Sequence, residues 1–136
     1  MKELSYKAEI GNIARATEAV QEWLEEHGCS SGIQIKIAVA LDEVLSNIAR
    51  YAYPKRDGSF TVRMDYDSLN KMAVMSFVDS GVPFNPLERK EPDVTLSIED
   101  RPIGGLGIFL VRKMMDGVKY ERKDGKNILT LYKKIV

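Results

Sequence analysis

The chain has 136 residues, of which 44% are hydrophobic and 29% charged, a composition ordinary for a folded globular domain. Its 20 Lys and Arg balance 20 Asp and Glu, which argues against a nucleic-acid binder that relies on an overall positive field. One cysteine and one histidine exclude an intrachain disulfide and all but exclude a Cys/His zinc site. We expect a single domain over residues 1–136, in the cytoplasm, without a signal peptide or a membrane span.

The N-terminal residues predict a strand followed by a helix. Residues 3–10 alternate between apolar and polar side chains, a period of two that is typical of a half-buried strand. Residues 13–27 show helical spacing, with Asn12 as the expected N-cap and Gly28 as the expected end.

A second helix is predicted over about 33–52, capped by Ser30 or Ser31. Its apolar stripe is rich in Ala, Ile, Val and Leu, so we expect this helix to pack centrally.

A hairpin follows, with strands over 59–67 and 72–79 joined by a turn at 68–71. The second strand is nearly all apolar and is expected to be central in the sheet. Residues 80–103 contain four prolines and mixed charges, which predicts a long loop with one short helical turn.

The last third of the chain predicts one helix and two strands. Residues 104–107 open a helix over 108–115, and strands over 118–123 and 128–135 are linked by 124–127. The whole pattern predicts an α+β fold, a two-layer sandwich of a mixed, mostly antiparallel sheet with helices on one face.

Glu43 and Asn47 are the first candidate site residues. They are four residues apart on the second predicted helix, so their side chains project together. The carboxylate can act as a base, and the amide oxygen suits a hard cation such as Mg²⁺. By itself, such a pair is more often the solvated polar face of an amphipathic helix.

Asp79 ends the apolar strand and precedes Ser80 and Gly81. A carboxylate at this place can accept a hydrogen bond from an amino group deep in a pocket, and a glycine lets the backbone approach a flat ligand. By itself, Asp-x-Gly is more often a simple turn.

The glycine run Gly104–Gly107 lies between the long loop and a helix N-terminus, where free N–H groups and the helix dipole suit phosphate. It lacks the Gly-Lys-Ser/Thr of a P-loop, and no strand precedes it as in a dinucleotide fingerprint. Thr130, on the last predicted strand, could share a ligand group with Asp79, although threonine is also simply a good strand former.

In combination, these pieces resemble a known superfamily. The segments ALDEVLSNIARYAY, VDSGVPFNPLE and RPIGGLGIFLVRKMMDGVKYERKDGKNILTL are similar to motifs of the histidine-kinase-like ATPases, which include gyrase, the heat-shock chaperones, sensor histidine kinases and MutL. Within that superfamily the chain most resembles the anti-sigma-factor serine/threonine kinases.

The resemblance implies a Mg-ATP site. Asn47 would hold Mg²⁺ on the triphosphate, and Glu43 would orient or deprotonate the attacking hydroxyl of a protein substrate. Asp79, with Gly81 beside it, would bind the adenine amino group, supported by Thr130. These roles agree with phosphoryl transfer, which needs positioning and charge neutralisation more than covalent chemistry.

The resemblance extends to the glycine-rich lid. Gly105 and Gly107 would let the lid wrap the phosphates, with Gly104 in the same site. The basic lid residues Arg89, Lys90 and Arg101 could also reach phosphate, although such charges are more often simply solvated; of the three we keep Arg101 as a phosphate contact. One position departs from the family pattern, since Arg50 stands where a histidine is frequent.

The resemblance also implies partners. Family members phosphorylate a serine or threonine of a small antagonist protein, many hold a sigma factor and so regulate transcription, and they often form homodimers. We expect no direct contact with nucleic acid or membrane.

Other readings of the same motifs fit less well. A sensor histidine kinase needs a phosphoacceptor histidine on a dimerisation helix, and the only histidine, His27, precedes the nucleotide motifs. A gyrase-like or MutL-like ATPase needs a following domain with a catalytic lysine, and none is expected after Val136.

A different class stays open, namely an ATP-dependent protein-binding module without significant kinase activity. Glu43 favours the enzyme. A domain that has lost ATP binding is disfavoured because all the motif pieces are present.

Overall fold

The computed structural model describes residues 1–54, 57–88 and 105–136. Within these residues the strands form one antiparallel sheet in the order β1-β2-β3-β5-β4. The strands are β1 (Lys2–Lys7), β2 (Ser59–Asp67), β3 (Met72–Asp79), β4 (Gly117–Lys123) and β5 (Lys126–Lys134). The helices are α1 (Gly11–Glu26), α2 (Ser31–Asn47) and α3 (Gly105–Met114).

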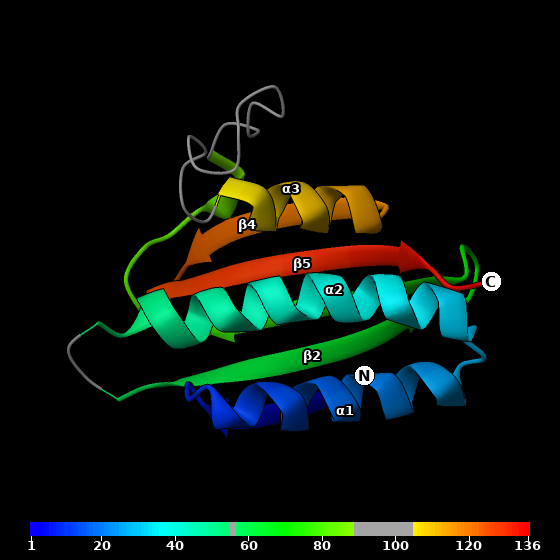
Figure 1. The fold of residues 1–136 in the computed structure, drawn as a ribbon, viewed down its shortest axis with the longest axis horizontal. Coiled ribbons are helices and arrows are strands. Elements are labelled where there is room, and N and C mark those ends of the chain that lie inside the picture. The colour runs from blue at the N-terminus through cyan, green and yellow to red at the C-terminus, as the bar shows by residue number, and fades with distance from the viewer. Residues whose placement is uncertain (55–56, 89–104) are drawn as a thin grey trace.

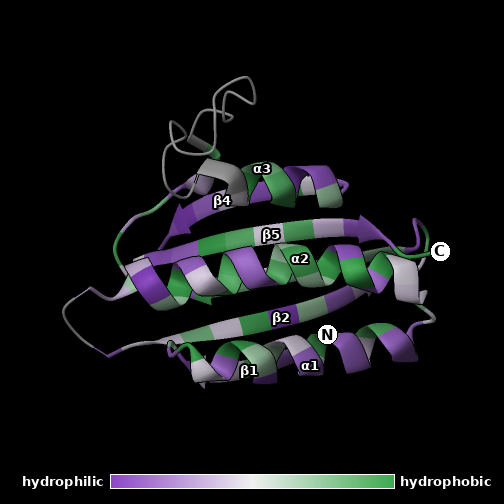
Figure 2. Ribbon diagram, viewed as in Figure 1, coloured by the Kyte–Doolittle hydropathy of each residue, from purple (hydrophilic) through white to green (hydrophobic). Residues whose placement is uncertain are grey.

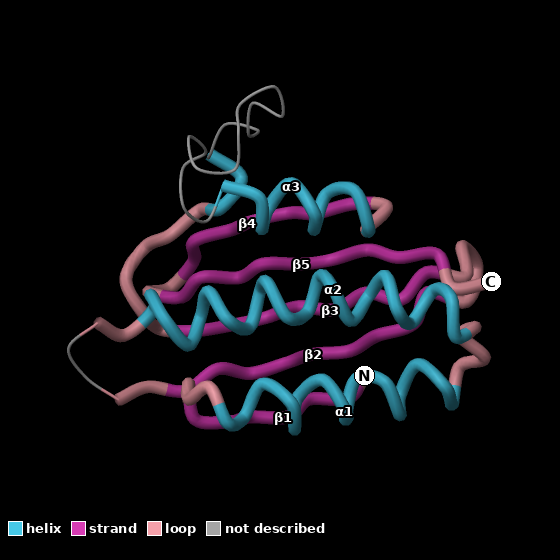
Figure 3. Tube along the Cα trace, viewed as in Figure 1, coloured by secondary structure: helices cyan, strands magenta, loops and turns pink. Residues whose placement is uncertain are grey.

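The three α-helices lie in a single layer over one face of the sheet (Figures 1 and 3). This arrangement confirms the predicted two-layer α+β sandwich. The described strands are all antiparallel, so the sheet is more regular than the mixed sheet that we expected.

The N-terminal strand and helix differ from the prediction in their junction. The strand ends at Lys7, and α1 begins at Gly11 with Ile10 in the N-cap position and no side-chain cap. The expected cap, Asn12, is wrong, because its Nδ2 instead donates to the carbonyl of Lys7 at 3.0 Å. The predicted end of the helix is confirmed by Gly28, whose φ of +79° favours glycine.

The second helix is capped and buried as predicted, but it does not remain α-helical to its end. Ser30 is the N-cap, and its Oγ accepts from the backbone N–H of Ile33 at 3.4 Å. Beyond Asn47 the chain continues as a π-helical segment, η1 (Ile48–Ala52). Such segments are frequent at functional sites. The predicted stripe is buried throughout, at Ile37, Leu41, Val44, Leu45, Ile48 and Ala52.

The central hairpin has the predicted strand limits, and β3 occupies the middle of the sheet as expected. Its turn is held by the carboxylate of Asp67, whose Oδ1 accepts from the backbone N–H groups of Leu69 and Asn70 at 3.1 and 3.3 Å. The short helical turn expected in the following loop is present as the 3₁₀ segment η2 (Pro86–Glu88).

The C-terminal hairpin is tighter than expected. Its turn consists of Asp124 and Gly125, with φ values of +52° and +76°, the backbone of a two-residue hairpin turn. The predicted linker 124–127 is therefore too long, because Lys126 and Asn127 already belong to β5.

The core lies between the helices and the inner strands. Green, hydrophobic residues follow α2 and β5 at the centre of the molecule, whereas β4 at the sheet edge is largely purple (Figure 2). The inward side chains of β2 and β3, such as Phe60, Met64, Met75 and Phe77, are almost completely buried. None of the described helices combines the length and the apolar character that crossing a bilayer requires.

Candidate functional site

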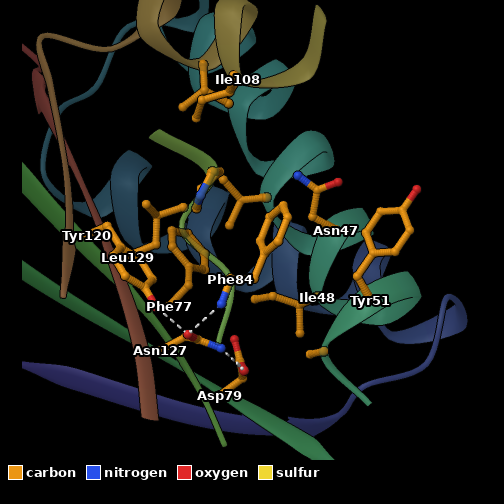
Figure 4. Close-up of a pocket in the computed structure, with 14 residues that line it drawn as sticks. Asn47, Ile48, Tyr51, Phe77, Asp79, Phe84, Ile108, Tyr120, Asn127 and Leu129 are labelled. Carbon is orange, nitrogen blue, oxygen red and sulfur yellow. Dashed lines mark hydrogen bonds between the residues drawn. The ribbon is translucent and has the colours of Figure 1, made fainter. Parts of the chain in front are cut away.

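A pocket opens at the end of the sheet where β3 finishes and β5 begins, between η1 and α3 (Figure 4). Three polar side chains line it: Asn47, Asp79 and Asn127. The other lining residues are aliphatic or aromatic: Val44, Ile48, Tyr51, Ala52, Phe77, Phe84, Pro86, Ile108, Val111, Tyr120 and Leu129. An apolar cleft with few convergent polar groups is typical of small-molecule sites.

Asp79 lies at the floor of this pocket and is only 6% exposed. Its Oδ1 accepts two hydrogen bonds, from the backbone N–H of Gly81 and from Nδ2 of Asn127, both at 2.9 Å. No described residue donates a hydrogen bond to its Oδ2. Since a carboxylate oxygen has about two acceptor sites, Oδ1 is occupied and Oδ2 remains for a ligand.

Gly81 places the turn after β3 directly against the end of η1. A Cβ at this position would collide with the backbone carbonyl of Ala52. That carbonyl also accepts from the N–H of Val82 at 2.9 Å. A glycine is therefore needed here for space, because a side chain would push the turn out of the pocket floor.

Asn47 and Glu43 lie one helical turn apart near the end of α2, and both are half-buried. Asn47 lines the pocket, whereas Glu43 does not. Glu43 instead lies against α3, because a Cβ added to Gly107 would meet its Oε2. Asn47 thus faces the pocket, and Glu43, one turn earlier on α2, lies beside the start of α3.

The glycine run contributes the beginning of α3. The helix starts at Gly105, three residues before the expected Ile108, and Gly107 is buried in its first turn. The first N–H groups of a helix have no intrahelical partner, which makes this end suitable for an anion. Two of the predicted site residues, Gly104 and Arg101, lie outside the described residues.

Thr130 is not part of this pocket, so its expected proximity to Asp79 is wrong. It pairs with Ser76 in the ladder between β3 and β5, and the two hydroxyl oxygens lie 3.0 Å apart. Side chains alternate along a strand, and Ser76 and Thr130 project from the face of the sheet opposite to Phe77 and Asp79.

The residue that meets Asp79 is Asn127, which the sequence reasoning missed. The strand register places it directly opposite Asp79, and it is 6% exposed. The signal was the Asp124-Gly125 pair, which is typical of a two-residue hairpin turn. Starting β5 just after that pair puts Asn127 on the same face as Leu129.

Aromatic side chains that were also missed form the walls of the pocket. Tyr51 from η1 and Phe84 from the loop after β3 face each other, with ring centroids 6.4 Å apart (Figure 4). Tyr120 contributes from β4, and its hydroxyl donates to Oδ1 of Asn127 at 2.5 Å. A flat ligand above Asp79 would therefore lie among aromatic and aliphatic surfaces.

The protein oxygens at this site fit a metal ion that is held mainly by the phosphates of a bound nucleotide. No group of three or more His, Cys, Asp or Glu among the described residues could hold a metal ion. Asn47 offers a single hard oxygen, and Mg²⁺ is commonly bound through one or two protein oxygens together with substrate phosphates.

Comparison with known proteins agrees with this geometry. The family profile described as the histidine kinase-like ATPase domain matches residues 6–133. The chain belongs to this family. Membership of an ATPase domain family implies ATP binding, which the pocket chemistry fits.

Two curated relatives are kinases by name. The chain is 28% identical over 120 residues to the serine/threonine-protein kinase BtrW of Bordetella bronchiseptica, covering 85% of this chain and 83% of the relative. It is 30% identical over 95 residues to the serine-protein kinase RsbW of Bacillus thuringiensis, covering 67% of this chain and 58% of that protein.

A solved structure supports the fold. The histidine kinase AdeS of Acinetobacter baumannii superposes with a TM-score of 0.51 at 12% identity, covering 99% of this chain and 69% of that one. This likeness concerns the fold alone.

Proposed function

We propose that the protein is a Mg-ATP-dependent serine/threonine protein kinase of the anti-sigma type, which phosphorylates a small antagonist protein and sequesters a sigma factor. The observation that carries the proposal is that Asp79 and Asn47 line one pocket, while Glu43, one turn of α2 from Asn47, lies beside the start of α3. The names of the relatives give further support.

The adenine would enter the pocket and donate its amino group to Oδ2 of Asp79. This oxygen receives no hydrogen bond from the described residues, and Oδ1 is already used by Gly81 and Asn127. The walls around Tyr51 and Phe84 suit a flat aromatic base.

The triphosphate would run from the pocket toward the N-terminus of α3. Asn47, on the way, would supply an oxygen to the Mg²⁺ that accompanies the phosphates. When bound, Mg²⁺ neutralises phosphate charge. Gly105 and Gly107 belong to the first turn of this helix, where N–H groups that have no intrahelical partner favour an anion.

Glu43 would be the general base. It lies against Gly107 at the start of α3, one turn of α2 from Asn47. Its carboxylate would accept the proton of a serine or threonine hydroxyl while that oxygen forms its bond to the terminal phosphorus and ADP leaves. Proton transfer of this kind contributes about 10²–10⁴-fold to a rate.

The proposed protein partners follow from the same family resemblance. A kinase of this kind would act in the cytoplasm as a homodimer, with an antagonist protein as its substrate and a sigma factor as its second partner. Its output would be regulation of transcription.

The test is transfer of the γ-phosphate of ³²P-labelled ATP, with Mg²⁺, to any small antagonist protein that is encoded nearby. We expect labelling of a serine or threonine by the wild-type protein. Glu43→Gln should lower the transfer rate by about 100-fold or more while the ATP affinity changes little, because the amide keeps the shape but loses the base. Asp42→Asn, which removes the neighbouring exposed carboxylate, is the matched control.

The outcomes separate two functions. ATP binding without any labelling would favour the alternative, an ATP-dependent protein-binding module. Unchanged transfer by Glu43→Gln would contradict the role of Glu43 as the base. Loss of transfer in Asp42→Asn to the same extent would indicate a general effect of charge on this helix.

A further inference from the structure

We propose that Asn127 is the positioning residue of the pocket, which holds the Asp79 carboxylate in its ligand-accepting orientation and ties it to the loop after β3. This inference rests on the proposed nucleotide site and adds a second residue, absent from the sequence prediction, to the recognition of the base. Asn127 would act through Asp79, without a hydrogen bond of its own to the nucleotide.

All four hydrogen-bonding positions of the Asn127 amide are used. Nδ2 donates to Oδ1 of Asp79 at 2.9 Å and to the carbonyl of Val82 at 2.8 Å. Oδ1 accepts from the hydroxyl of Tyr120 at 2.5 Å and from the N–H of Phe84 at 3.2 Å (Figure 4). A buried amide with every position satisfied has one rotamer and one orientation.

The hydrogen-bond partners also determine which amide atom of Asn127 is oxygen and which is nitrogen. A backbone N–H, here that of Phe84, can only donate, and the carbonyl of Val82 can only accept. The NH₂ group must therefore face Asp79. That contact uses the second acceptor site of Oδ1 and leaves Oδ2 directed to the ligand.

The same amide links two parts of the site. Val82 and Phe84 lie in the segment between β3 and η2, and Phe84 is itself a wall of the pocket. Arg122 of β4 adds a further anchor, because its guanidinium donates to the carbonyl of Gly81 at 2.9 Å. The position of the base and the position of this segment are thus set through one side chain.

The consequence to test is that a donor facing Asp79 is required. Asn127→Asp keeps the size of the side chain and its acceptor oxygens but replaces the NH₂ group by an oxygen. At pH 8 two carboxylates then face each other and repel, whereas at lower pH a single shared proton restores the bridge. The charged and titratable groups that hydrogen-bond to Asn127 or to the turn after β3 in the described residues are Asp79, the hydroxyls of Tyr120 and Tyr53, and Arg122.

The experiment is calorimetric titration with Mg-ADP at pH 8.0 and 5.5. We expect Asn127→Asp to bind about 10-fold or more weakly than wild type at pH 8.0. At pH 5.5 the difference from wild type should shrink at least about 3-fold, because one proton restores the bond to Asp79 but not the bond to the carbonyl of Val82. Asn85→Asp is the matched control, since among the described residues its Oδ1 accepts only from the nearby N–H of Leu87 in the same segment. Its affinity should follow that of the wild type at both pH values.

Equal weakening of Asn127→Asp at both pH values would overturn the positioning role, since a merely structural loss does not recover with a proton. Circular dichroism at each pH monitors folding. Hydrogen exchange in the wild-type protein gives an independent test. The side-chain NH₂ protons of Asn127 should exchange with water at least about 10-fold more slowly than those of Asn85.

The two proposals fail in different ways. Wild-type protein that does not bind Mg-ADP would contradict the proposed function, and the exchange measurement would still decide whether the amide is held. Rapid exchange of the Asn127 amide in a protein that binds Mg-ADP would overturn the positioning role alone.

Discussion

At the residue scale, the main feature of the pocket is that the two carboxylate oxygens of Asp79 differ in their hydrogen bonds. Oδ1 of Asp79 is held by Gly81 and Asn127, whereas no described residue donates to Oδ2. A neutral donor that contacts Oδ2 would make a hydrogen bond to a charged, desolvated group, which is stronger than an ordinary one.

Asp79→Asn should therefore weaken ATP binding by about 10- to 100-fold, the loss of one hydrogen bond to a charged group. The change is nearly isosteric, so we expect the fold to be kept. Titration calorimetry with Mg-ATP measures the effect.

Asp65→Asn, at an exposed position of β2, is the control for loss of a negative charge. If ATP affinity were unchanged in Asp79→Asn, the adenine assignment of this carboxylate would be wrong.

The sequence was sufficient for some site residues because helical spacing alone fixes their relation. Glu43 and Asn47 share one side of α2, and Asp79 ends an apolar strand, as their spacing predicted. Thr130 and Asn127 were misjudged for one reason: membership of the site depends on which face of a strand a residue occupies. The predicted strand began two residues after the true start of β5, so Asn127 was assigned to the turn instead of the strand.

At the scale of elements, the contact between α2 and α3 is the most specific feature of the site. The two helices meet where Gly107 leaves room for the carboxylate end of Glu43. The absence of a side chain at this position is thus a condition for the placement of the proposed base.

Gly107→Ala should reduce phosphotransfer without reducing stability. The added Cβ meets only the flexible end of Glu43, which can move, so the fold is kept while the carboxylate is displaced. Alanine in a helix is also favoured over glycine by roughly 0.5–1 kcal/mol. We expect transfer to fall at least about 10-fold, measured by the ³²P assay beside urea unfolding.

Gly32→Ala in the first turn of α2 is the matched control, because a Cβ there meets nothing within 4 Å. It should gain similar stability at full activity. Full activity in Gly107→Ala would show that the glycine is not needed for Glu43.

The fold was predictable wherever local chemistry sets an element's limits. The β2–β3 hairpin, the Ser30 cap and the central position of β3 followed from alternation and turn residues. The change of α2 into the π-helical η1 was not predictable, because that segment meets the turn at Gly81, a contact distant in the sequence.

For the molecule as a whole, the buried cysteine reports on stability. Cys29 is 8% exposed, between α1 and α2. Burial raises the pKa of its thiol, partly opposed by the positive charge of Lys133. The folded protein therefore holds this proton more tightly than the unfolded chain does, in which the pKa of a thiol is about 8.5.

The sign of the pH dependence follows. The contribution of this thiol to stability is fully present below about pH 8.5 and is lost as the pH rises through the folded pKa. Between pH 8 and 10, the free energy of unfolding should fall more steeply in wild type than in Cys29→Ala. Urea unfolding at several pH values measures both slopes, and parallel curves would contradict the prediction.

The pairing of Asp79 with Asn127 across β3 and β5 has a consequence for how the molecule becomes competent. The two residues are 48 positions apart and meet only when these strands are in register. A slip by one residue would turn one of them to the other face of the sheet. Recognition of the base therefore requires completed folding. A chain with its helices formed but its central strands unpaired would have no adenine site. Ligand binding would thus distinguish native molecules from folding intermediates.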